Sequence, residues 1–314
     1  MVERVLVTGV AGFVGRHLAD AVIGRGARVW GVGFGELPAG LRLERWTSAD
    51  VTDAAAVAAA VAEAEPQWVI HLAGQSSAAL SFRQPVETYR ANVLGTWGLL
   101  DAVRRHAREA RVLLVGSGEA YGPQAAGSRA SESAPFRPVS PYALSKAAAD
   151  SVGEAFANRH GLDLVRTRSF SHTGPGQSPA FALPSFARQI AAIEERAGEA
   201  VLRVGNLDVV RDITNVRDVT GAYLALLERG RRGAAYNVCS GEGTLLADAV
   251  RTLCGLARVP VRIEVDPALV RAADVPWLVG DPSAIGRDTG WHASTPLHQT
   301  LEGLLEDWRS RTTV

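Results

Sequence analysis

The sequence has few cysteines and no net charge. Its two cysteines, Cys239 and Cys254, belong to no Cys-x-x-Cys pair or Cys/His cluster, and none of the seven histidines pairs at metal-ligand spacing. We therefore expect two buried structural thiols, no disulfide framework and no metal site. The 33 basic residues balance the 33 acidic ones. This balance predicts neither a nucleic-acid partner nor attraction to an anionic membrane.

Long hydrophobic runs and internal repeats are also absent. No apolar stretch reaches membrane-spanning length, and a strand expected by Val5 leaves no room for a signal peptide. These absences predict a cytoplasmic protein whose partner is a small molecule. With 314 residues, the chain is long enough for one large α/β domain or for two domains that share an interface.

Short β-branched runs alternate with helical patterns in the first half of the chain. Strands are predicted at 4–8, 28–32, 68–72, 112–115 and 162–166. Each is followed by ten or more residues of helical character, including an alanine-rich surface helix that Asp53 caps. This alternation predicts a parallel sheet with right-handed helical crossovers, which is a doubly wound α/β fold of the Rossmann type.

Three glycines follow the first predicted strand at intervals of three residues. Gly9 permits a tight turn, Gly12 lets the backbone approach a pyrophosphate, and Gly15 lets a helix pack closely on the strand. The phosphates would then meet the free N–H groups at the N-terminus of that helix. The loop, which includes Phe13 and Val14, predicts a dinucleotide site.

The rhythm of the chain loosens after residue 170 into Gly/Pro-rich segments. A helix is predicted at 181–197, a buried strand at 236–238 and a final helix at 295–308. We therefore expect residues 1–172 to form the dinucleotide-binding Rossmann domain, completed by about 208–250. Residues 173–207 and 251–314 are expected to form a smaller C-terminal substrate domain.

The end of the second strand bears on which dinucleotide binds. Residues 32–35 carry neither the acid that holds the ribose hydroxyls of NAD nor an adjacent arginine for a 2′-phosphate. The missing acid favours NADP(H), with NAD(H) as the alternative. Arg42 or Arg45 could reach the phosphate, or each is a solvated surface charge. Asp50 and Val51 are expected beside the adenine ring, with a turn as the alternative role for Asp50.

A helix start with a tyrosine and a lysine predicts the reactive centre. Ser140 and Pro141 are typical of a helix N-terminus, so Tyr142 and Lys146 fall on one face of that helix. A nearby ammonium lowers the pKa of a tyrosine from about 10 and assists proton transfer near neutral pH. Ser117 follows a buried strand, and its hydroxyl could polarise the same substrate oxygen. Together these residues predict carbonyl/alcohol chemistry.

Four further motifs accompany the glycine loop: His71-Leu72-Ala73-Gly74, Asn92-Val93-x-Gly95-Thr96, Ser117 with Tyr121-Gly122, and Tyr142-x-x-x-Lys146. Over nearly the whole chain they resemble the extended short-chain dehydrogenase/reductases, which include nucleotide-sugar epimerases, 4,6-dehydratases and 4-ketoreductases. The resemblance implies that Ser117, Tyr142 and Lys146 are the catalytic set. It also implies that residues 72–74 flank the cofactor and that Asn92 sets the local conformation, for which a purely structural role is the alternative.

The substrate half carries a narrower resemblance. Residues 168–177, 186–190, 204–207, 211–212, 236–241 and 271–276 look like the corresponding stretches of GDP-6-deoxy-4-keto-D-mannose reductases. The match implies NADPH-dependent reduction of GDP-4-keto-6-deoxy-D-mannose to a GDP-6-deoxyhexose, GDP-D-rhamnose; a 4-epimerase or a 4,6-dehydratase is the alternative. It departs at Ser171, where the family usually has asparagine, and this bears on the identity of the sugar. Many relatives pair through two long helices, which implies a homodimer.

Candidate substrate contacts follow from the charge of a nucleotide sugar. Its diphosphate needs guanidinium partners, and Arg188, Arg211 and Arg271 are the candidates, with a surface ion pair as the alternative for the first and the last. Ser171, Asn206 and Asp274 are further candidates from the resemblance.

Glu119 is the residue that separates two reactions. It lies two positions after Ser117, where the resemblance to 4,6-dehydratases implies a base that removes the C5 proton. The alternative is a carboxylate that only contacts substrate in a reductase.

Overall fold

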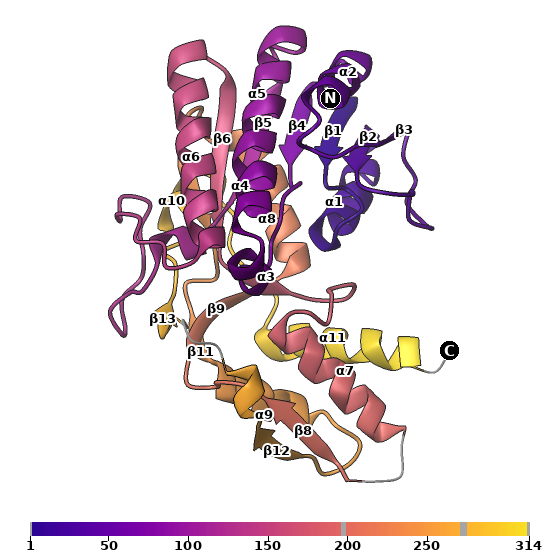
Figure 1. Ribbon diagram of the computed structural model, residues 1–314, viewed down its shortest axis with the longest axis vertical. Helices are drawn as coiled ribbons and strands as arrows, with labels where there is room; N and C mark the ends of the chain where they lie inside the picture. Colours follow the sequence, from indigo (N-terminus) through magenta and orange to yellow (C-terminus); the bar gives the residue numbers. More distant parts are fainter. Residues whose placement is uncertain (1, 196–198, 271–274, 313–314) are drawn as a thin grey trace.

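The computed structural model describes residues 2–195, 199–270 and 275–312. Within these ranges, seven parallel strands form one sheet in the order β10-β6-β5-β4-β1-β2-β3. Figure 1 shows the run from β6 to β3. The strands are β1 (Arg4–Thr8), β2 (Arg28–Gly33), β3 (Arg45–Ser48), β4 (Trp68–His71), β5 (Arg111–Ser117), β6 (Asp163–Ser169) and β10 (Ala235–Val238). The predicted doubly wound α/β fold is confirmed. The short edge strand β3 was not predicted, because its four residues carry no apolar alternation.

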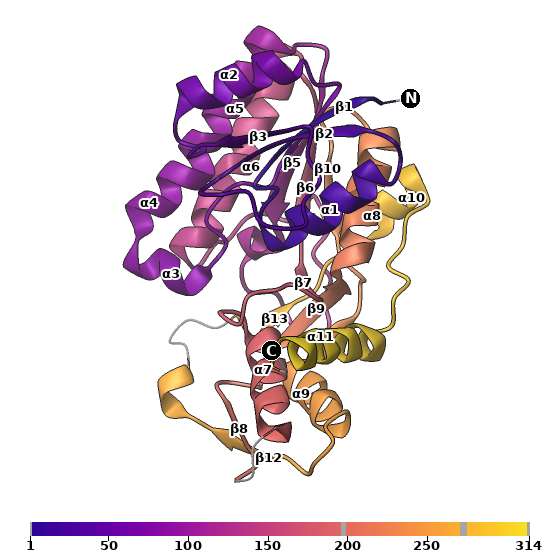
Figure 2. The same cartoon turned by 90° about the vertical axis from the view of Figure 1, so that its right-hand side faces the viewer.

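Helices cover both faces of this sheet, and Figure 2 shows the strands between the two helical layers. On one side lie α1 (Phe13–Ile23) and α8 (Val216–Arg229), and on the other lie α2 (Ala54–Ala64), α5 (Gly95–His106) and α6 (Pro141–His160). Successive residues of β1 therefore enter different cores: Val5 and Val7 pack with the first layer, and Leu6 packs with the second. Burial on both faces explains why the strands read as continuous apolar runs.

Short elements join the sheet to the second helical layer. They are α3 (Ala78–Arg83), α4 (Pro85–Tyr89), the π-helical turn η1 (Arg90–Leu94) and the 3₁₀ turn η2 (Gly118–Tyr121). The π-helical turn leads directly into α5, and η2 follows β5 at the carboxyl edge of the sheet. Both short turns therefore lie near the place where ligands bind in such folds.

A smaller lobe lies beyond the carboxyl edge of the large sheet (Figure 1). Its elements are β7 (Ser171–Thr173), α7 (Ala182–Glu194), β8 (Val201–Val204), β9 (Val210–Asn215), β11 (Gly243–Leu245), α9 (Leu246–Gly255), β12 (Arg262–Val265), η3 (Pro267–Leu269), β13 (Trp277–Leu278) and α11 (Leu297–Thr312). Strand β9 pairs with β7, β11 and β13, while β8 pairs with β12. Helices α7, α9 and α11 share one apolar core. The predicted strand at 236–238 and the predicted helices near 181 and 295 are confirmed as β10, α7 and α11.

The chain passes between the two lobes several times. After β9, it returns to the large sheet as α8 and β10, and then re-enters the small lobe as β11 and α9. The short helix α10 (Ser283–Thr289) packs against α8, with Ile285 in the core beneath the large sheet. The two lobes interleave along the chain. The exact domain boundaries at 172, 208 and 250 stay a prediction.

No helix within the described ranges combines the length and the apolar character needed to cross a membrane.

Candidate active site

A cavity of about 990 Å³ lies where the carboxyl ends of the large sheet face the small lobe. One end is lined by the glycine loop, the end of β2 and the segment after β4, and the other by residues of β8, β9 and α7. Predicted catalytic residues line the wall between these two ends.

The glycine loop leaves no room for side chains. Gly9 has a φ of +74°, and a Cβ built there would lie 2.7 Å from the backbone nitrogen of Ala73. A Cβ on Gly15 would lie 2.4 Å from the carbonyl oxygen of Gly9. Gly12 is the N-cap of α1 and can offer no capping side chain of its own. Because all three glycines line the cavity together with Phe13 and Val14, this cradle fits the pyrophosphate of a dinucleotide.

The end of the cavity at which the adenosine of a dinucleotide is expected is formed by the end of β2 and the segment that follows β3. Gly33 takes the last position of β2, and a Cβ there would lie 2.6 Å from the Trp46 ring. Phe34 lines the cavity and is 79% exposed. Of the two arginines considered for a 2′-phosphate, Arg45 pairs with Glu63 on the surface at 3.2 Å.

Asp50 and Val51 line the same end of the cavity. The Asp50 carboxylate forms a turn with Thr52, whose N–H and hydroxyl each donate to Asp50 Oδ1 at 2.8 Å. Val51 is buried against Gly95 of α5. The predicted adenine contact and the alternative turn role of Asp50 are thus compatible.

The three predicted catalytic residues come together on the cavity wall. Ser117 ends β5, and Tyr142 and Lys146 occupy the first turns of α6. That helix begins as predicted, because the Ser140 hydroxyl accepts the N–H of Ala143 at 3.0 Å. The Tyr142 phenol is buried and hydrogen-bonded to the Ser117 hydroxyl. A substrate oxygen beside the phenol could contact both hydroxyls.

The pKa of Tyr142 differs from what the sequence predicted. Burial raises the pKa of Tyr142, and the nearby Glu119 carboxylate raises it further, whereas the Ser117 hydrogen bond lowers it. Burial also lowers the pKa of Lys146 to about 8, and its ammonium donates to the carbonyl oxygen of Val115 at 3.1 Å. The lowering of the Tyr142 pKa by Lys146, which the sequence predicted, is not among the causes of the Tyr142 shift, and burial sets its direction. Lys146 is also the single lysine of the sequence, a signal that points to this residue on composition alone.

The motif that flanks the cofactor site shows the same lack of space. Leu72, Ala73 and Gly74 line the cavity. Gly74 has a φ of +153°, and a Cβ on it would lie 2.5 Å from Asn92 Oδ1. Asn92 lies behind this segment and does not itself line the cavity.

The substrate end holds some of the predicted residues and not others. Ser171, Asn206 and Arg211 line the cavity. The Arg211 guanidinium is oriented by its own main chain and by the segment that precedes β13, since it donates to the carbonyls of Val210 at 2.9 Å and Val275 at 2.6 Å. Arg188 is exposed on α7 and does not line the cavity. Arg271 and Asp274 lie outside the described residues.

Several residues that line the cavity were not predicted as site residues, among them Arg203, His172 and Tyr223. Arg203 of β8 lines the substrate end and pairs with Glu264 at 3.3 Å. His172 lines the cavity with its ring stacked on Phe13 of the glycine loop, at 6.1 Å between centroids. Tyr223 of α8 is fully buried, and its hydroxyl lies 2.7 Å from Ser169 Oγ at the cavity wall. The position of Arg203 just before a Gly-Asn loop was a usable signal, whereas Tyr223 lies within an apolar helical run that gives none.

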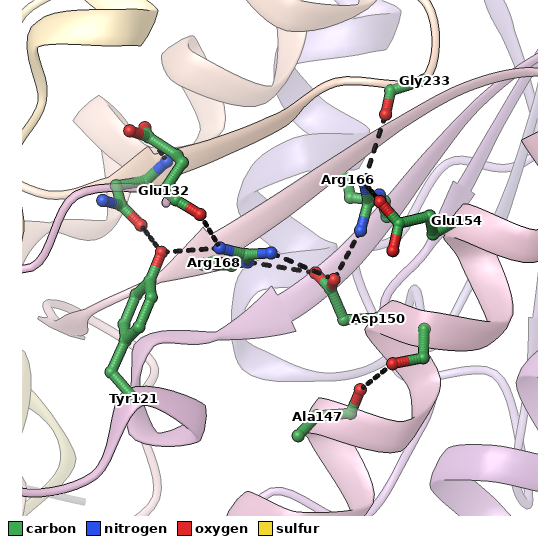
Figure 3. Close-up of polar contacts among 10 residues, drawn as sticks. Tyr121, Glu132, Ala147, Asp150, Glu154, Arg166, Arg168 and Gly233 are labelled. Carbon is green, nitrogen blue, oxygen red and sulfur yellow. Dashed lines mark hydrogen bonds and ion pairs between the residues drawn. The ribbon is translucent and has the colours of Figure 1, made fainter. Parts of the chain in front are cut away.

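A buried ionic cluster supports α6 from behind (Figure 3). Asp150 of α6 pairs with Arg166 at 2.5 Å and with Arg168 at 3.2 Å, both from β6. Arg168 donates in turn to the Tyr121 hydroxyl at 2.9 Å and to the Glu132 carbonyl at 2.7 Å. The cluster therefore joins the catalytic helix, its neighbouring strand and the η2 turn after Ser117. Within the described ranges, no group of three or more potential metal ligands is assembled.

The fold and this cavity define an NAD(P)-dependent oxidoreductase of the extended short-chain dehydrogenase/reductase type. The family model described as GDP-mannose 4,6 dehydratase matches residues 6–304, and the chain belongs to that family.

Individual relatives agree with this assignment. The chain is 36% identical over 312 residues to GDP-6-deoxy-D-mannose reductase from Pseudomonas aeruginosa, covering 99% of each protein. A solved structure of RMD from Pseudomonas aeruginosa complexed with NADPH is 34% identical, with a TM-score of 0.85 over 98% of this chain and 100% of that one. UDP-glucose 4-epimerase from Thermus thermophilus, in complex with NAD, is 30% identical with a TM-score of 0.87 over 98% and 99%. The resemblance inferred from the sequence motifs is confirmed.

Proposed function

We propose that this protein is a nucleotide-sugar 4-ketoreductase that uses NADPH to reduce GDP-4-keto-6-deoxy-D-mannose to GDP-D-rhamnose. The observation that carries the proposal is a buried Tyr142 phenol hydrogen-bonded to Ser117 on the cavity wall, in a chain that matches a GDP-6-deoxy-D-mannose reductase along its whole length. The missing acid at Gly33 favours NADPH over NADH. Use of NAD(H) remains the alternative, since the epimerase relative is complexed with NAD.

The residues of the chain account for the proton side of the reaction. A bound NADPH would supply the hydride that adds to C4. Ser117 polarises the C4 carbonyl by donating a hydrogen bond to its oxygen. Tyr142 then transfers its phenolic proton to that oxygen as the C=O π bond breaks, which leaves a phenolate. The Lys146 ammonium compensates the phenolate charge and holds the nicotinamide ribose, and solvent returns the proton.

The other residues of the cavity would bind and orient the two ligands. The cradle around Gly9, Gly12, Phe13, Val14 and Gly15 takes the pyrophosphate, and Asp50 and Val51 take the adenine. At the opposite end, Arg211 and Arg203 pair with the diphosphate of the sugar nucleotide. Ser171 and Asn206 contact the sugar or its phosphates.

A 4,6-dehydratase is the second candidate, and Glu119 is the observation that favours it. Its carboxylate lies near enough to Tyr142 to raise the pKa of the phenol. A base that removes the C5 proton of a hexose would need that neighbourhood. The two reactions differ in cofactor use, because a reductase oxidises one NADPH for each sugar and a dehydratase recycles its cofactor.

Two substrates offered in parallel distinguish these reactions. GDP-mannose is supplied with catalytic NADP, and GDP-4-keto-6-deoxymannose with stoichiometric NADPH, while reduced-cofactor absorbance and product mass are followed. We expect NADPH loss and a gain of two hydrogens only with the keto sugar. Loss of water from GDP-mannose without net cofactor change would replace the reductase by the dehydratase.

Variants of two residues complete this experiment. Tyr142→Phe should reduce turnover by roughly two to four decades while NADPH affinity stays within a few-fold, because only the transferred proton is lost. Glu119→Gln should leave keto-sugar reduction largely intact, since no C5 proton is removed. Near-normal turnover of Tyr142→Phe, or abolition by Glu119→Gln, contradicts the proposed mechanism.

We also propose a cytoplasmic homodimer. Exposed apolar side chains on η1, α5 and α6, among them Leu94, Trp97 and Leu144, are 62%, 54% and 49% accessible. Pairing of two copies through these helices would cover them.

A further inference from the structure

His71 is a buried polar residue that the proposed mechanism does not use. It ends β4, is 2% exposed and does not line the cavity. Its ring lies between two threonine hydroxyls, with Nδ1 2.7 Å from Thr8 Oγ1 on β1 and Nε2 3.1 Å from Thr96 Oγ1 on α5. Burial and the charge of Lys146 lower the pKa of His71 to about 3, so the imidazole is neutral and carries one N–H.

The surrounding acceptors decide which ring nitrogen carries that proton. The Thr96 hydroxyl donates its only proton to the carbonyl oxygen of Asn92 at 2.7 Å, so Thr96 Oγ1 must accept from His71 Nε2–H. Nδ1 is then an acceptor, and the Thr8 hydroxyl donates to it. Thr8 Oγ1 in turn accepts the N–H of Ala73 at 3.3 Å. Every proton in this series of hydrogen bonds therefore has one assigned acceptor, and the direction of each bond is determined.

The Asn92 carbonyl, at the end of this series of hydrogen bonds, belongs to an irregular turn. Asn92 lies within the π-helical turn η1, where the N–H of Gly95 donates five residues back to Arg90. A π-helical turn interrupts the regular ladder of main-chain hydrogen bonds and is common at functional sites. The Thr96 hydroxyl supplies a hydrogen bond to the Asn92 carbonyl at this place. His71 holds that hydroxyl in position.

The Asn92 side chain connects the two segments that carry the proposed site. Its Oδ1 accepts the N–H of Gln75 at 2.8 Å, and its Nδ2 donates to the Gln75 carbonyl at 3.0 Å. Nδ2 also donates to Ser145 Oγ at 2.9 Å, and the Ser145 hydroxyl donates to the Tyr142 carbonyl at 2.7 Å. One amide thus sets the cofactor-flanking segment and the first turn of α6 relative to each other.

We propose that His71 is a positioning residue. Through the Thr96 hydroxyl it holds the π-helical turn that aims the Asn92 amide at residues 72–75 and at the turn bearing Tyr142 and Lys146. The role rests on the proposed function insofar as those two residues act on the substrate. Its first consequence is for dinucleotide binding, because residues 72–74 line the cofactor end of the cavity.

Two variants of His71 separate the two sides of the ring. The amide of a glutamine reaches the place of Nε2 and can donate to Thr96, whereas the amide of an asparagine reaches only the place of Nδ1 and Thr8. NADPH affinity is measured by fluorescence titration, with circular dichroism and melting temperature as checks of folding. We expect His71→Gln to bind NADPH within about threefold of the wild type, and His71→Asn to bind about tenfold more weakly.

A second pair tests the same link without changing the imidazole. Thr96→Val keeps the shape of the side chain and removes its hydroxyl, and Thr96→Ser keeps the hydroxyl. We expect Thr96→Val to weaken NADPH binding about tenfold and Thr96→Ser to restore it. Combined with His71→Asn, Thr96→Val should add little further loss of NADPH affinity, because both changes break the same series of hydrogen bonds. This pair decides the question if the His71 variants do not fold.

A merely structural histidine gives a different pattern. Melting temperatures would fall for both His71 variants, while NADPH affinity stayed equal in the folded proteins and Thr96→Val matched the wild type; this result overturns the proposal. Absence of NADPH binding to the wild type overturns it as well, together with the proposed function. Normal NADPH binding without reduction of the keto sugar contradicts the proposed function alone, and the variant pattern still decides the role of His71.

Discussion

At the cofactor end of the cavity the wall is main chain and glycine, whereas at the substrate end it carries long polar side chains. A Cβ on Gly9 or Gly15 would meet backbone atoms at 2.7 and 2.4 Å. Across the cavity, Arg203 pairs with Glu264, and the Arg211 guanidinium donates to the carbonyls of Val210 and Val275. The first end therefore presents a tightly packed main-chain surface, and the second presents positive charge on side chains.

This difference teaches where tolerance to change lies. An added atom at the cofactor end must displace main chain, which interiors resist because they are closely packed. A shortened side chain at the substrate end removes an attraction and leaves the backbone in place. Three predictions test this contrast, beginning with the largest expected effect.

Gly9→Ala should weaken NADPH binding roughly a hundredfold, because the loop must shift by a sizeable fraction of an ångström from its productive geometry. The matched control is Gly26→Ala. Gly26 has a φ of +83° but no atom within 4 Å of its built Cβ, so it carries the same backbone strain without the collision. Fluorescence titration of both variants measures the effect. Equal affinities of the two variants would show that contact with Ala73 does not govern the loop.

Arg211→Ala should lower kcat/KM for the keto sugar about tenfold to a hundredfold through KM, since a charged hydrogen bond to the diphosphate is lost. NADPH affinity should stay unchanged. Arg188→Ala is the control, because that arginine is exposed outside the cavity, and we expect kinetics like those of the wild type. A larger loss with Arg188→Ala than with Arg211→Ala would place the diphosphate elsewhere.

Lys146 gives the third test, because the sequence contains no other lysine. Burial lowers its pKa to about 8. Acylation of Lys146 by an amine-reactive reagent should therefore increase with pH around that midpoint. NADPH at ten times its Kd should slow the labelling about tenfold. Peptide mass spectrometry separates Lys146 from the terminal amine. A midpoint near 10, or labelling that NADPH does not slow, contradicts a buried ammonium beneath the cofactor.

Several features of the site were readable in the sequence because they are local. The turn at Gly9 and the capped start of α6 each depend on residues within one or two helical turns, and both are present. The exposure of Arg188 was readable too. Leu183, Phe186, Ala187 and Ile190 form the buried stripe of α7, so the intervening arginine had to face away.

Other features followed from long-range packing. Tyr223 reaches the cavity because α8 crosses beneath the sheet beside β6, and Arg203 reaches it because β8 is placed by the core of α7, α9 and α11. The raised pKa of Tyr142 follows from burial and from Glu119. A sequence motif does not show how deeply the fold buries its side chains.

The sequence by itself determined the cradle, the helix with its Tyr/Lys spacing and the alternation that builds the sheet, because φ preferences, capping and periodicity act between near neighbours. Only the tertiary structure decided which arginines line the cavity, how the pKa values of Tyr142 and Lys146 are shifted, and that His71 supports Asn92. The last of these outcomes requires residues from β1, β4, η1, α5 and α6 to meet. Their meeting depends on the closure of the whole sheet and its helical layers.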